Sequence, residues 1–198
     1  MKIVSAAFVL SAGHASECPL GEQPELAVSG RSNVGKSSLL NALLGRRALA
    51  KVSNTPGKTR RLNFFLVNDA FHFVDLPGYG FAKASARSRN EWSDMMQEYL
   101  QSRRQCVGIL QAVDIRHSPS KEDREMVRWL REEQMPFCLI ATKADKLAPT
   151  KRGPALRAIA RELELPATQP MTLWSSETGE GRAELLAWVA SALADAQG

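Results

Sequence analysis

The sequence predicts one α/β domain, in which a mostly parallel six-stranded sheet carries helices on both faces. Two observations support this fold class. Short apolar runs of strand length alternate with segments whose apolar residues recur at helical spacing. The length of 198 residues suits one domain with a full hydrophobic core, whereas two independent domains would each be small. Alternating strands and helices favour parallel pairing with both faces of the sheet covered.

A glycine-rich loop joins the first predicted strand to the first predicted helix. The apolar run Leu26–Ser29 is expected to be a strand that leads into Gly30. A helix is expected over Ser37–Leu44, where leucines recur at helical spacing. Residues 45–61 show no periodicity and contain a Pro-Gly pair, which predicts a long loop. Loops of that length inside a compact domain are usually functional or mobile.

The next two strands are predicted to form an antiparallel hairpin. They span Leu62–Val67 and Ala70–Val74, and only Asn68-Asp69 separates them. His72 alternates with phenylalanines in the second strand, so its side chain is expected on the solvent side. A glycine-rich loop follows at Pro77–Gly80.

The rest of the chain continues the alternation. A helix is expected where Trp92, Met95, Met96, Tyr99 and Leu100 recur at helical spacing. The later elements are predicted as strand Val107–Val113, helix Lys121–Glu133, strand Phe137–Ala141, a helix near Ala155–Leu163, strand Met171–Trp174 and helix Arg182–Leu193.

The helix at Lys121–Glu133 has a start signal in its sequence. Ser120 and Asp123 form a capping-box pattern there. Glu122 and Asp123 fall on the polar side of this helix, so solvated carboxylates are expected at both positions.

The loop between the first strand and helix matches a phosphate-binding pattern. Gly30–Ser37 fits GxxxxGK[ST], in which backbone N–H groups wrap phosphate oxygens at a helix N-terminus. Lys36 would neutralise the β- and γ-phosphates, and the Ser37 hydroxyl would ligate Mg²⁺. The alternative is a glycine turn without a ligand, but a full match between a strand and a helix is rare by chance.

An acidic residue follows the strand that ends at Val74. In the segment Asp75–Gly78, Asp75 could hold Mg²⁺ through water, and Gly78 has no side chain to keep its N–H from a γ-phosphate. Taken alone the pattern is weak evidence, because aspartate and glycine are common in any turn. Its value lies in following the phosphate loop at a strand end.

A third motif, Thr142–Asp145, predicts which base is bound. Guanine presents a ring N–H beside an amino group, and one carboxylate can accept from both, whereas adenine offers no such pair. Asp145 is therefore predicted to select guanine, with the aliphatic stem of Lys143 over the base face. Ser175–Glu177 would close the base pocket with backbone donors, although alone it cannot be told from a serine-rich loop.

These four motifs, in this order and each at a strand end, resemble the translation-factor-type P-loop GTPases, whose Ras-like domain is also that of Era. A narrower resemblance covers roughly residues 24–195 and is to the EngB (YihA/YsxC) family of bacterial ribosome-biogenesis GTPases. It rests on GRSNVGKSSLLNALL, NTPGKTRRLNFF, DLPGYGFAK and TKADK. The segment Phe8–Ala12 resembles the family's N-terminal extension, which argues against a secretory signal. The implied division is an extension at 1–23 and a GTPase domain at 24–198.

The resemblance also implies where the switch loops lie. The second Mg²⁺ ligand is placed at Thr59, with Thr55 as the fallback. The loops Lys51–Arg61 and Leu76 to about Ser88 are expected to order when γ-phosphate is present.

One departure from Ras-like proteins concerns catalysis. Tyr79 follows Gly78, where those proteins place the glutamine that orients the attacking water. Intrinsic hydrolysis is therefore expected to be slow unless a partner or a bound ion assists. Asn33 resembles the asparagine that holds K⁺ in related potassium-dependent GTPases, which makes K⁺ a candidate for the missing charge.

The predicted site gathers residues from five segments. The predicted catalytic residues are Lys36, Thr59 and Gly78. The predicted metal ligands are Ser37 and Thr59 for Mg²⁺, Asp75 through water, and Asn33 for K⁺. The predicted GTP contacts are Gly30, Arg31, Ser32, Asn33, Val34, Gly35, Lys36, Ser37, Gly57, Lys58, Thr59, Asp75, Leu76, Pro77, Gly78, Thr142, Lys143, Ala144, Asp145, Ser175, Ser176 and Glu177.

Positive charge gathers in the predicted long loop. The net charge is +5, and no acidic residue occurs from Leu26 to Asn68. The basic residues of this stretch that crowd the loop are Arg46, Arg47, Lys51, Lys58, Arg60 and Arg61. They could form an RNA contact or an ordinary solvated face.

The family resemblance implies a role for the whole chain. It implies a GTP-driven switch in the assembly of the large ribosomal subunit, with rRNA and ribosomal proteins as partners and a need in cell division and septation. One alternative is a P-loop nucleotide kinase, which would need a second substrate site and an Arg-bearing lid. The motif Thr142–Asp145 argues against a kinase. Another is a division-site interaction protein without a ribosomal role.

Composition bounds the remaining classes. The three cysteines lack metal-ligand or CxxC spacing, so buried reduced thiols are expected. No segment reaches the roughly 18 apolar residues that a membrane span needs. A cytoplasmic protein is therefore expected. With the family resemblance, the expectation becomes a monomer that binds GTP and GDP and has no DNA or membrane partner.

Overall fold

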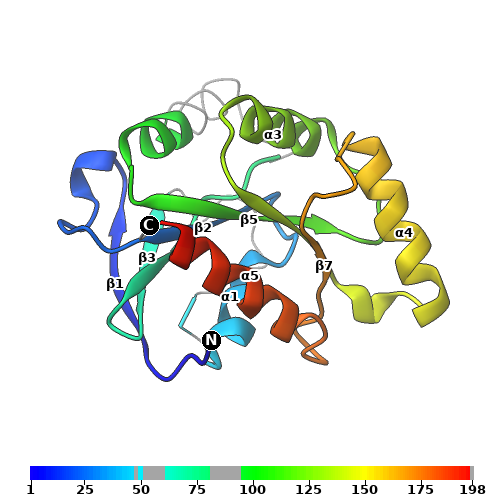
Figure 1. The fold of residues 1–198 in the computed structure, drawn as a ribbon, viewed down its shortest axis with the longest axis horizontal. Coiled ribbons are helices and arrows are strands. Elements are labelled where there is room, and N and C mark those ends of the chain that lie inside the picture. The colour runs from blue at the N-terminus through cyan, green and yellow to red at the C-terminus, as the bar shows by residue number, and fades with distance from the viewer. Residues whose placement is uncertain (47–48, 51–60, 81–94, 197–198) are drawn as a thin grey trace.

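The computed structural model describes residues 1–46, 49–50, 61–80 and 95–196, and these form one sheet with helices around it (Figure 1). The strands are β1 (Ala6–Ala12), β2 (Glu25–Gly30), β3 (Leu62–Val67), β4 (Phe71–Asp75), β5 (Cys106–Asp114), β6 (Phe137–Thr142) and β7 (Met171–Leu173). The α-helices are α1 (Lys36–Leu44), α3 (Lys121–Glu132), α4 (Pro149–Glu162) and α5 (Arg182–Asp195), with further helical residues at 95–102. Short 3₁₀ turns lie at Ala15–Glu17 and Ala144–Lys146.

The sheet is mostly parallel, as predicted. Its order is β1-β3-β4-β2-β5-β6-β7, and β2, β4, β5, β6 and β7 all run in one direction. Among the described strands, β3 alone runs in the opposite direction and pairs antiparallel with both β1 and β4, and a two-residue turn joins it to β4. Asn68 and Asp69 take positive φ angles of 51° and 54° in that turn, which asparagine and aspartate tolerate better than most residues.

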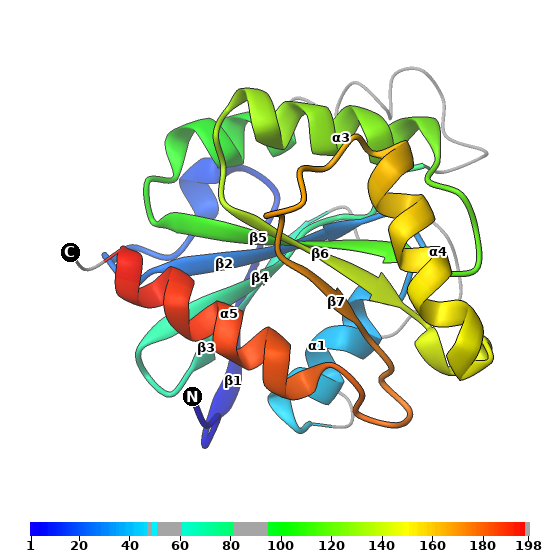
Figure 2. The same cartoon turned by 45° about the vertical axis from the view of Figure 1, so that its right-hand side comes forward.

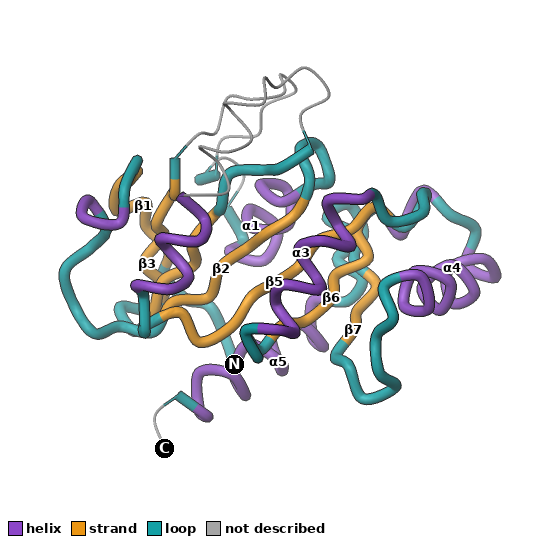
Figure 3. Tube along the Cα trace, turned by 90° about the horizontal axis from the view of Figure 1, so that it is seen from above, coloured by secondary structure: helices purple, strands orange, loops and turns teal. Residues whose placement is uncertain are grey.

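Helices cover both faces of the sheet and form two apolar layers. On one face the leucines of α1 pack with Leu185 and Val189 of α5. On the other face lie α3, α4 and the helical residues 95–102, which contribute Tyr99, Leu130 and Ile159 (Figures 1 and 2). Seen from above, α3 lies over the parallel strands β5 and β6 (Figure 3). This cover on both faces explains why the central strands are buried along their whole length.

The described sheet has seven strands where the sequence predicted six. The additional strand is β1, which comes from the segment expected only as an N-terminal extension and pairs antiparallel with the outer edge of β3. Phe8 packs edge to face on Phe65, with ring centroids 5.8 Å apart, and Asn68 Oδ1 accepts from the N–H groups of Val4 and Ser5. Sequence reasoning missed β1 because its side chains are largely exposed and show no alternation.

The structure differs from three local expectations of the sequence analysis. The expectation that His72 faces solvent was wrong. Its side chain is 5% exposed, because β4 lies inside the sheet with cover on both faces, and this burial lowers the pKa of His72. Asp123 was wrongly expected to be solvated and is also 5% exposed, although its capping box with Ser120 is confirmed. Helix α4 begins at Pro149, earlier than predicted, since the fixed φ of proline suits the first helical turn.

Two further findings concern the burial of the cysteines and the length of the apolar helices. Cys18, Cys106 and Cys138 are buried free thiols, and burial raises the pKa of Cys138 to about 12. Among the described residues, no helix combines the length and the apolar character needed to cross a bilayer.

Candidate functional site

The phosphate loop connects β2 to α1 and depends on two glycines. Gly30 has a φ of 148°, and a Cβ atom added there would lie 2.7 Å from Ala112 O, so no other residue fits without a backbone shift. Gly35 caps α1 with a φ of 111°. The loop therefore passes close to β5 and leads directly into the N-terminus of α1, which is the geometry of an anion site.

Lys36 lies under this loop and faces Gly78. Its Nζ donates to Gly30 O at 3.1 Å, and burial lowers the pKa of the ammonium while the Asp75 carboxylate opposes that shift. A Cβ atom added to Gly78 would lie 2.7 Å from Lys36 Nζ. The backbone of Gly78 and the charge of Lys36 therefore meet at one point beside the phosphate loop, as the motifs predicted.

Asp75 and Ser37 form the candidate metal centre. Ser37 Oγ donates to Asp75 Oδ2 at 3.3 Å. Asp75 Oδ1 is buried and has no hydrogen-bond partner among the described residues. Burial raises the pKa of the Asp75 carboxyl to about 6, against the opposing effects of Lys36 and Ser37. A hydroxyl beside a buried, unsatisfied carboxylate oxygen fits a hard divalent cation such as Mg²⁺.

Part of the predicted site lies outside the described residues. This holds for Gly57, Lys58, Thr59 and its fallback Thr55, and also for Arg47, Lys51 and Arg60 of the basic loop. The loop nevertheless has a defined start, because the Asn41 amide exchanges two hydrogen bonds of 2.8 Å with the backbone of Ala50.

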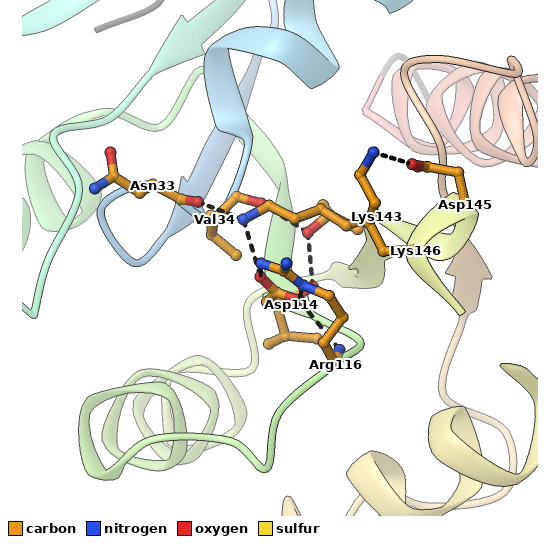
Figure 4. A network of polar contacts seen from close by, with 9 residues as sticks. Asn33, Val34, Asp114, Arg116, Lys143, Asp145 and Lys146 are labelled. Carbon is orange, nitrogen blue, oxygen red and sulfur yellow. Dashed lines mark hydrogen bonds and ion pairs between the residues drawn. The ribbon is translucent and has the colours of Figure 1, made fainter. Parts of the chain in front are cut away.

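Lys143 ties the base motif to the phosphate loop. It follows β6 with a φ of 61°, and its Nζ donates to Asn33 O at 2.7 Å (Figure 4). Thr142 Oγ1 likewise donates from the base motif to the phosphate loop, to Val34 O at 2.7 Å. The aliphatic stem of Lys143 consequently bridges the two motifs, where it could cover one face of a base.

Asp114 is a site residue that sequence reasoning missed. Its Oδ2 lies 2.9 Å from Lys143 Nζ, and both of its oxygens accept from Arg116 (Figure 4). Burial alone would raise the pKa of Asp114, but the hydrogen bonds from Arg116 and Lys143 hold it well below its usual range. A signal existed, because Asp114 directly follows the predicted strand Val107–Val113 at the ligand-binding edge of the sheet.

Asp145 and Ser175 join the third and fourth motifs. Ser175 Oγ donates to Asp145 Oδ1 at 2.8 Å and accepts from the N–H groups of Glu177 and Thr178 at 3.2 Å. The hydrogen bond from Ser175 is the main cause that lowers the pKa of Asp145, and Lys146 adds to it from 3.1 Å. Asp145 is therefore an ionised acceptor whose orientation is fixed by the loop 175–178.

The Tyr79 side chain is buried beneath α3. Its side chain is 4% exposed, and its hydroxyl lies among Asp123 and Gln111 beneath α3. The Tyr79 hydroxyl therefore hydrogen-bonds with these two buried side chains.

Known proteins resemble the chain along most of its length. A family model described as a 50S ribosome-binding GTPase matches residues 25–143. A protein of Pelotomaculum thermopropionicum described as probable GTP-binding protein EngB is 50% identical over 94% of this chain and 94% of its own length. Its namesake in Heliobacterium modesticaldum is 46% identical over 94% and 91%.

Solved structures share the fold. A crystal structure of a probable GTP-binding protein engB superposes with a TM-score of 0.72 and 21% identity, over 86% of this chain and 99% of that chain. Era in complex with MgGDPNP and nucleotides 1506–1542 of 16S ribosomal RNA superposes with a TM-score of 0.64 and 26% identity, over 84% of this chain and 55% of that chain.

Proposed function

The chain belongs to the EngB family of GTP-binding P-loop GTPases, and on that premise we propose that it is a slow GTPase whose nucleotide state controls binding to the assembling large ribosomal subunit. The observation that carries the enzymatic part is the meeting of Gly78 and Lys36 beside the phosphate loop. That point is where a γ-phosphate would find both a backbone N–H and a positive charge.

The base end of the site is proposed to bind guanine. The Asp145 carboxylate would accept from the ring N–H and the amino group, and the stem of Lys143 would cover one face of the base. The Ser176 N–H is the proposed donor to the guanine oxygen, because the Ser175 and Glu177 N–H groups already donate to Glu180 O and Ser175 Oγ. The ion pair between Asp114 and Lys143 supports this arrangement, because it holds the lysine ammonium beside the phosphate loop at Asn33.

Mg²⁺ is proposed at Ser37 and Asp75, with Thr59 as a further ligand. The unsatisfied Asp75 Oδ1 supports the assignment, and Era, a structural relative, was solved with MgGDPNP. The bound ion would neutralise phosphate charge. Ser37 would ligate it directly, whereas Asp75 would act through water, since its carboxylate lies at the base of the site and already accepts from the Ser37 hydroxyl.

Intrinsic hydrolysis is proposed to be slow, and K⁺ near Asn33 to assist it. We expect single-turnover GTP hydrolysis at about 10⁻³ per second or below in NaCl, because Tyr79 supplies no group that orients water. In KCl the rate should rise about tenfold if a second cation offsets the developing charge. Asn33→Ala should abolish the difference between the two salts, and equal rates in wild-type protein would exclude the K⁺ site.

The ribosomal partner is proposed from the family model and from the basic loop. The matched family is described as ribosome-binding. Arg46 and Arg61, the described basic residues at the two ends of the loop, are both exposed. Residues between them belong to the segment that is proposed to order with γ-phosphate, so GTP would create the RNA-binding surface and GDP would dissolve it.

Reversing the charge of this loop is expected to weaken large-subunit binding. The variant carries Glu at Arg46, Arg47, Arg60 and Arg61. Each arginine that neutralises a phosphate adds somewhat less than one unit to the slope of log affinity against log salt, so the salt dependence of binding should become flatter in the variant. The measurement is co-sedimentation with large subunits across a KCl series, with a non-hydrolysable GTP analogue or GDP bound.

A matched variant controls for net charge. It carries Glu at the exposed residues Arg128, Lys151, Arg157 and Arg161 of α3 and α4, and it should sediment like the wild type. The RNA-contact proposal would be wrong if large-subunit binding were the same with the analogue and with GDP, or if its salt dependence were unchanged by the four loop reversals. The basic loop would then be an ordinary solvated face.

The remaining parts of the proposal follow from the family. The protein is proposed to act as a cytoplasmic monomer without a DNA or membrane partner and to be needed for normal cell division and septation. Sedimentation with membranes instead of ribosomes would favour a division-site role, and phosphoryl transfer to nucleoside monophosphates would favour a nucleotide kinase.

A further inference from the structure

Tyr79 is held from both its side chain and its backbone. Its buried hydroxyl donates to Asp123 Oδ1 at 2.7 Å and accepts from Gln111 Nε2 at 2.6 Å. Its carbonyl oxygen accepts from the Ser32 N–H at 2.9 Å, and it forms a parallel bridge with Arg31. Position 79 therefore joins three elements that are distant in sequence, namely the phosphate loop, β5 and the start of α3.

The Asp123 carboxylate, which accepts the hydrogen bond from Tyr79, is itself held by hydrogen bonds. Asp123 Oδ2 accepts from the Ser120 N–H at 2.8 Å, and Ser120 Oγ accepts from the Asp123 N–H at 3.2 Å. The capping box of α3 thus orients Asp123, and Asp123 orients Tyr79. Burial, followed by the nearby Asp123 charge, raises the pKa of Tyr79 well above its usual value, so the hydroxyl remains a donor.

The backbone next to Tyr79 leaves little freedom to Gly78. A Cβ atom added to Gly78 would lie 3.0 Å from Ser32 N and 2.7 Å from Lys36 Nζ. A small rotation at position 79 would therefore move Gly78 either into the phosphate loop or away from Lys36.

We propose that Tyr79 is a positioning residue for the γ-phosphate: its anchored hydroxyl fixes the Gly78 backbone beside Lys36 and thereby sets the preference of the site for GTP over GDP. This inference rests on the proposed placement of GTP in the phosphate loop. It gives Tyr79 a role distinct from that of a water-orienting glutamine, since the side chain acts from beneath the site without touching the nucleotide.

The test is Tyr79→Phe, compared with a tyrosine in a matched environment. Tyr99 is also fully buried and donates to a buried carboxylate, Glu25 Oε2, at 2.7 Å, but Glu25 lies at the opposite end of β2 from the phosphate loop. Both substitutions remove one hydroxyl from a buried carboxylate. Thermal unfolding followed by circular dichroism should show a comparable loss of stability for Tyr79→Phe and Tyr99→Phe.

Nucleotide affinity separates positioning from stability. By calorimetry with Mg²⁺, Tyr79→Phe should bind a non-hydrolysable GTP analogue about tenfold more weakly, the scale of one lost hydrogen bond, and bind GDP within about twofold of the wild type. Tyr99→Phe should leave the ratio of the two affinities unchanged. An unchanged ratio in Tyr79→Phe, or an equal shift in Tyr99→Phe, would overturn the inference.

A second variant keeps the test valid if Tyr79→Phe does not fold. Gln111→Met removes one described partner of the Tyr79 hydroxyl together with a buried amide oxygen that has no hydrogen-bond partner among the described residues, so the fold should tolerate it. The analogue-to-GDP affinity ratio should fall in the same direction by a smaller factor, and an unchanged ratio would count against the inference. Failure of the wild type to bind GTP would instead refute the proposed function.

Discussion

Lys36→Ala is expected to lower the affinity for both GTP and GDP by about 100-fold or more while the fold remains intact. The substitution removes the charge that would meet the β- and γ-phosphates, and charge-assisted hydrogen bonds contribute about 1.5 to 3 kcal/mol each. The loop would keep its backbone N–H groups and the two glycines with positive φ, Gly30 and Gly35, because the substitution changes only a side chain.

The apo protein should tolerate this substitution well. Burial lowers the pKa of Lys36, which means that the folded state disfavours the ammonium, and this cost is offset by the Asp75 carboxylate and by a hydrogen bond to Gly30 O at 3.1 Å. Loss of the charge therefore removes a desolvation cost as well as a hydrogen bond, and the unfolding temperature should change little.

Calorimetry with each nucleotide, together with thermal unfolding, checks both parts. Lys121→Ala is the matched control, because the Lys121 side chain is 85% exposed and pairs only with Glu125 among the described residues. If a folded Lys36→Ala protein bound GTP and GDP with unchanged affinity, the assignment of Gly30–Ser37 as the phosphate-binding loop would be wrong.

Asp145→Asn is expected to exchange guanine preference for xanthine preference. The Ser175 hydroxyl, which now donates to Asp145 Oδ1, would hold the amide oxygen of the asparagine, so the amide NH₂ would take the place of Oδ2. A donor would then face the purine amino group of guanine unfavourably, whereas the additional carbonyl of xanthine could accept from it. GTP affinity should fall by about 2 to 3 kcal/mol, and XTP affinity should rise.

The control for this change is Asp69→Asn. Asp69 lies in the hairpin turn with a φ of 54°, which asparagine also adopts readily, so the same chemical change is made far from the site. Competition of GTP and XTP for each variant gives the result. Equal weakening toward both nucleotides would show that Asp145 supports the loop 175–178 without selecting the base.

The locally encoded parts of this protein could be predicted from its sequence. The strand Leu62–Val67 was predicted with the bounds that the structure shows, because the turn that sets its register is adjacent in the chain. The capping box at Ser120 and Asp123 likewise spans one helical turn. The phosphate, acidic and base motifs were placed together because parallel strands end at a common edge, and the structure confirms that these segments meet there.

Only the tertiary structure decided which side chains are buried and what they contact. Asp123 belongs to the polar side of its helix by periodicity, yet it is buried and accepts a hydrogen bond from Tyr79, 44 residues away in sequence. Lys143 and Asn33 are 110 residues apart, and β1 joins an edge that is formed by β3. Hydrophobic periodicity and capping patterns report interactions within a few residues, so the sequence alone determined the elements, their order and the motif positions. The pairing of β1, the burial of His72, the Asp114–Lys143 ion pair and the anchoring of Tyr79 depend on contacts that form only when distant segments pack together.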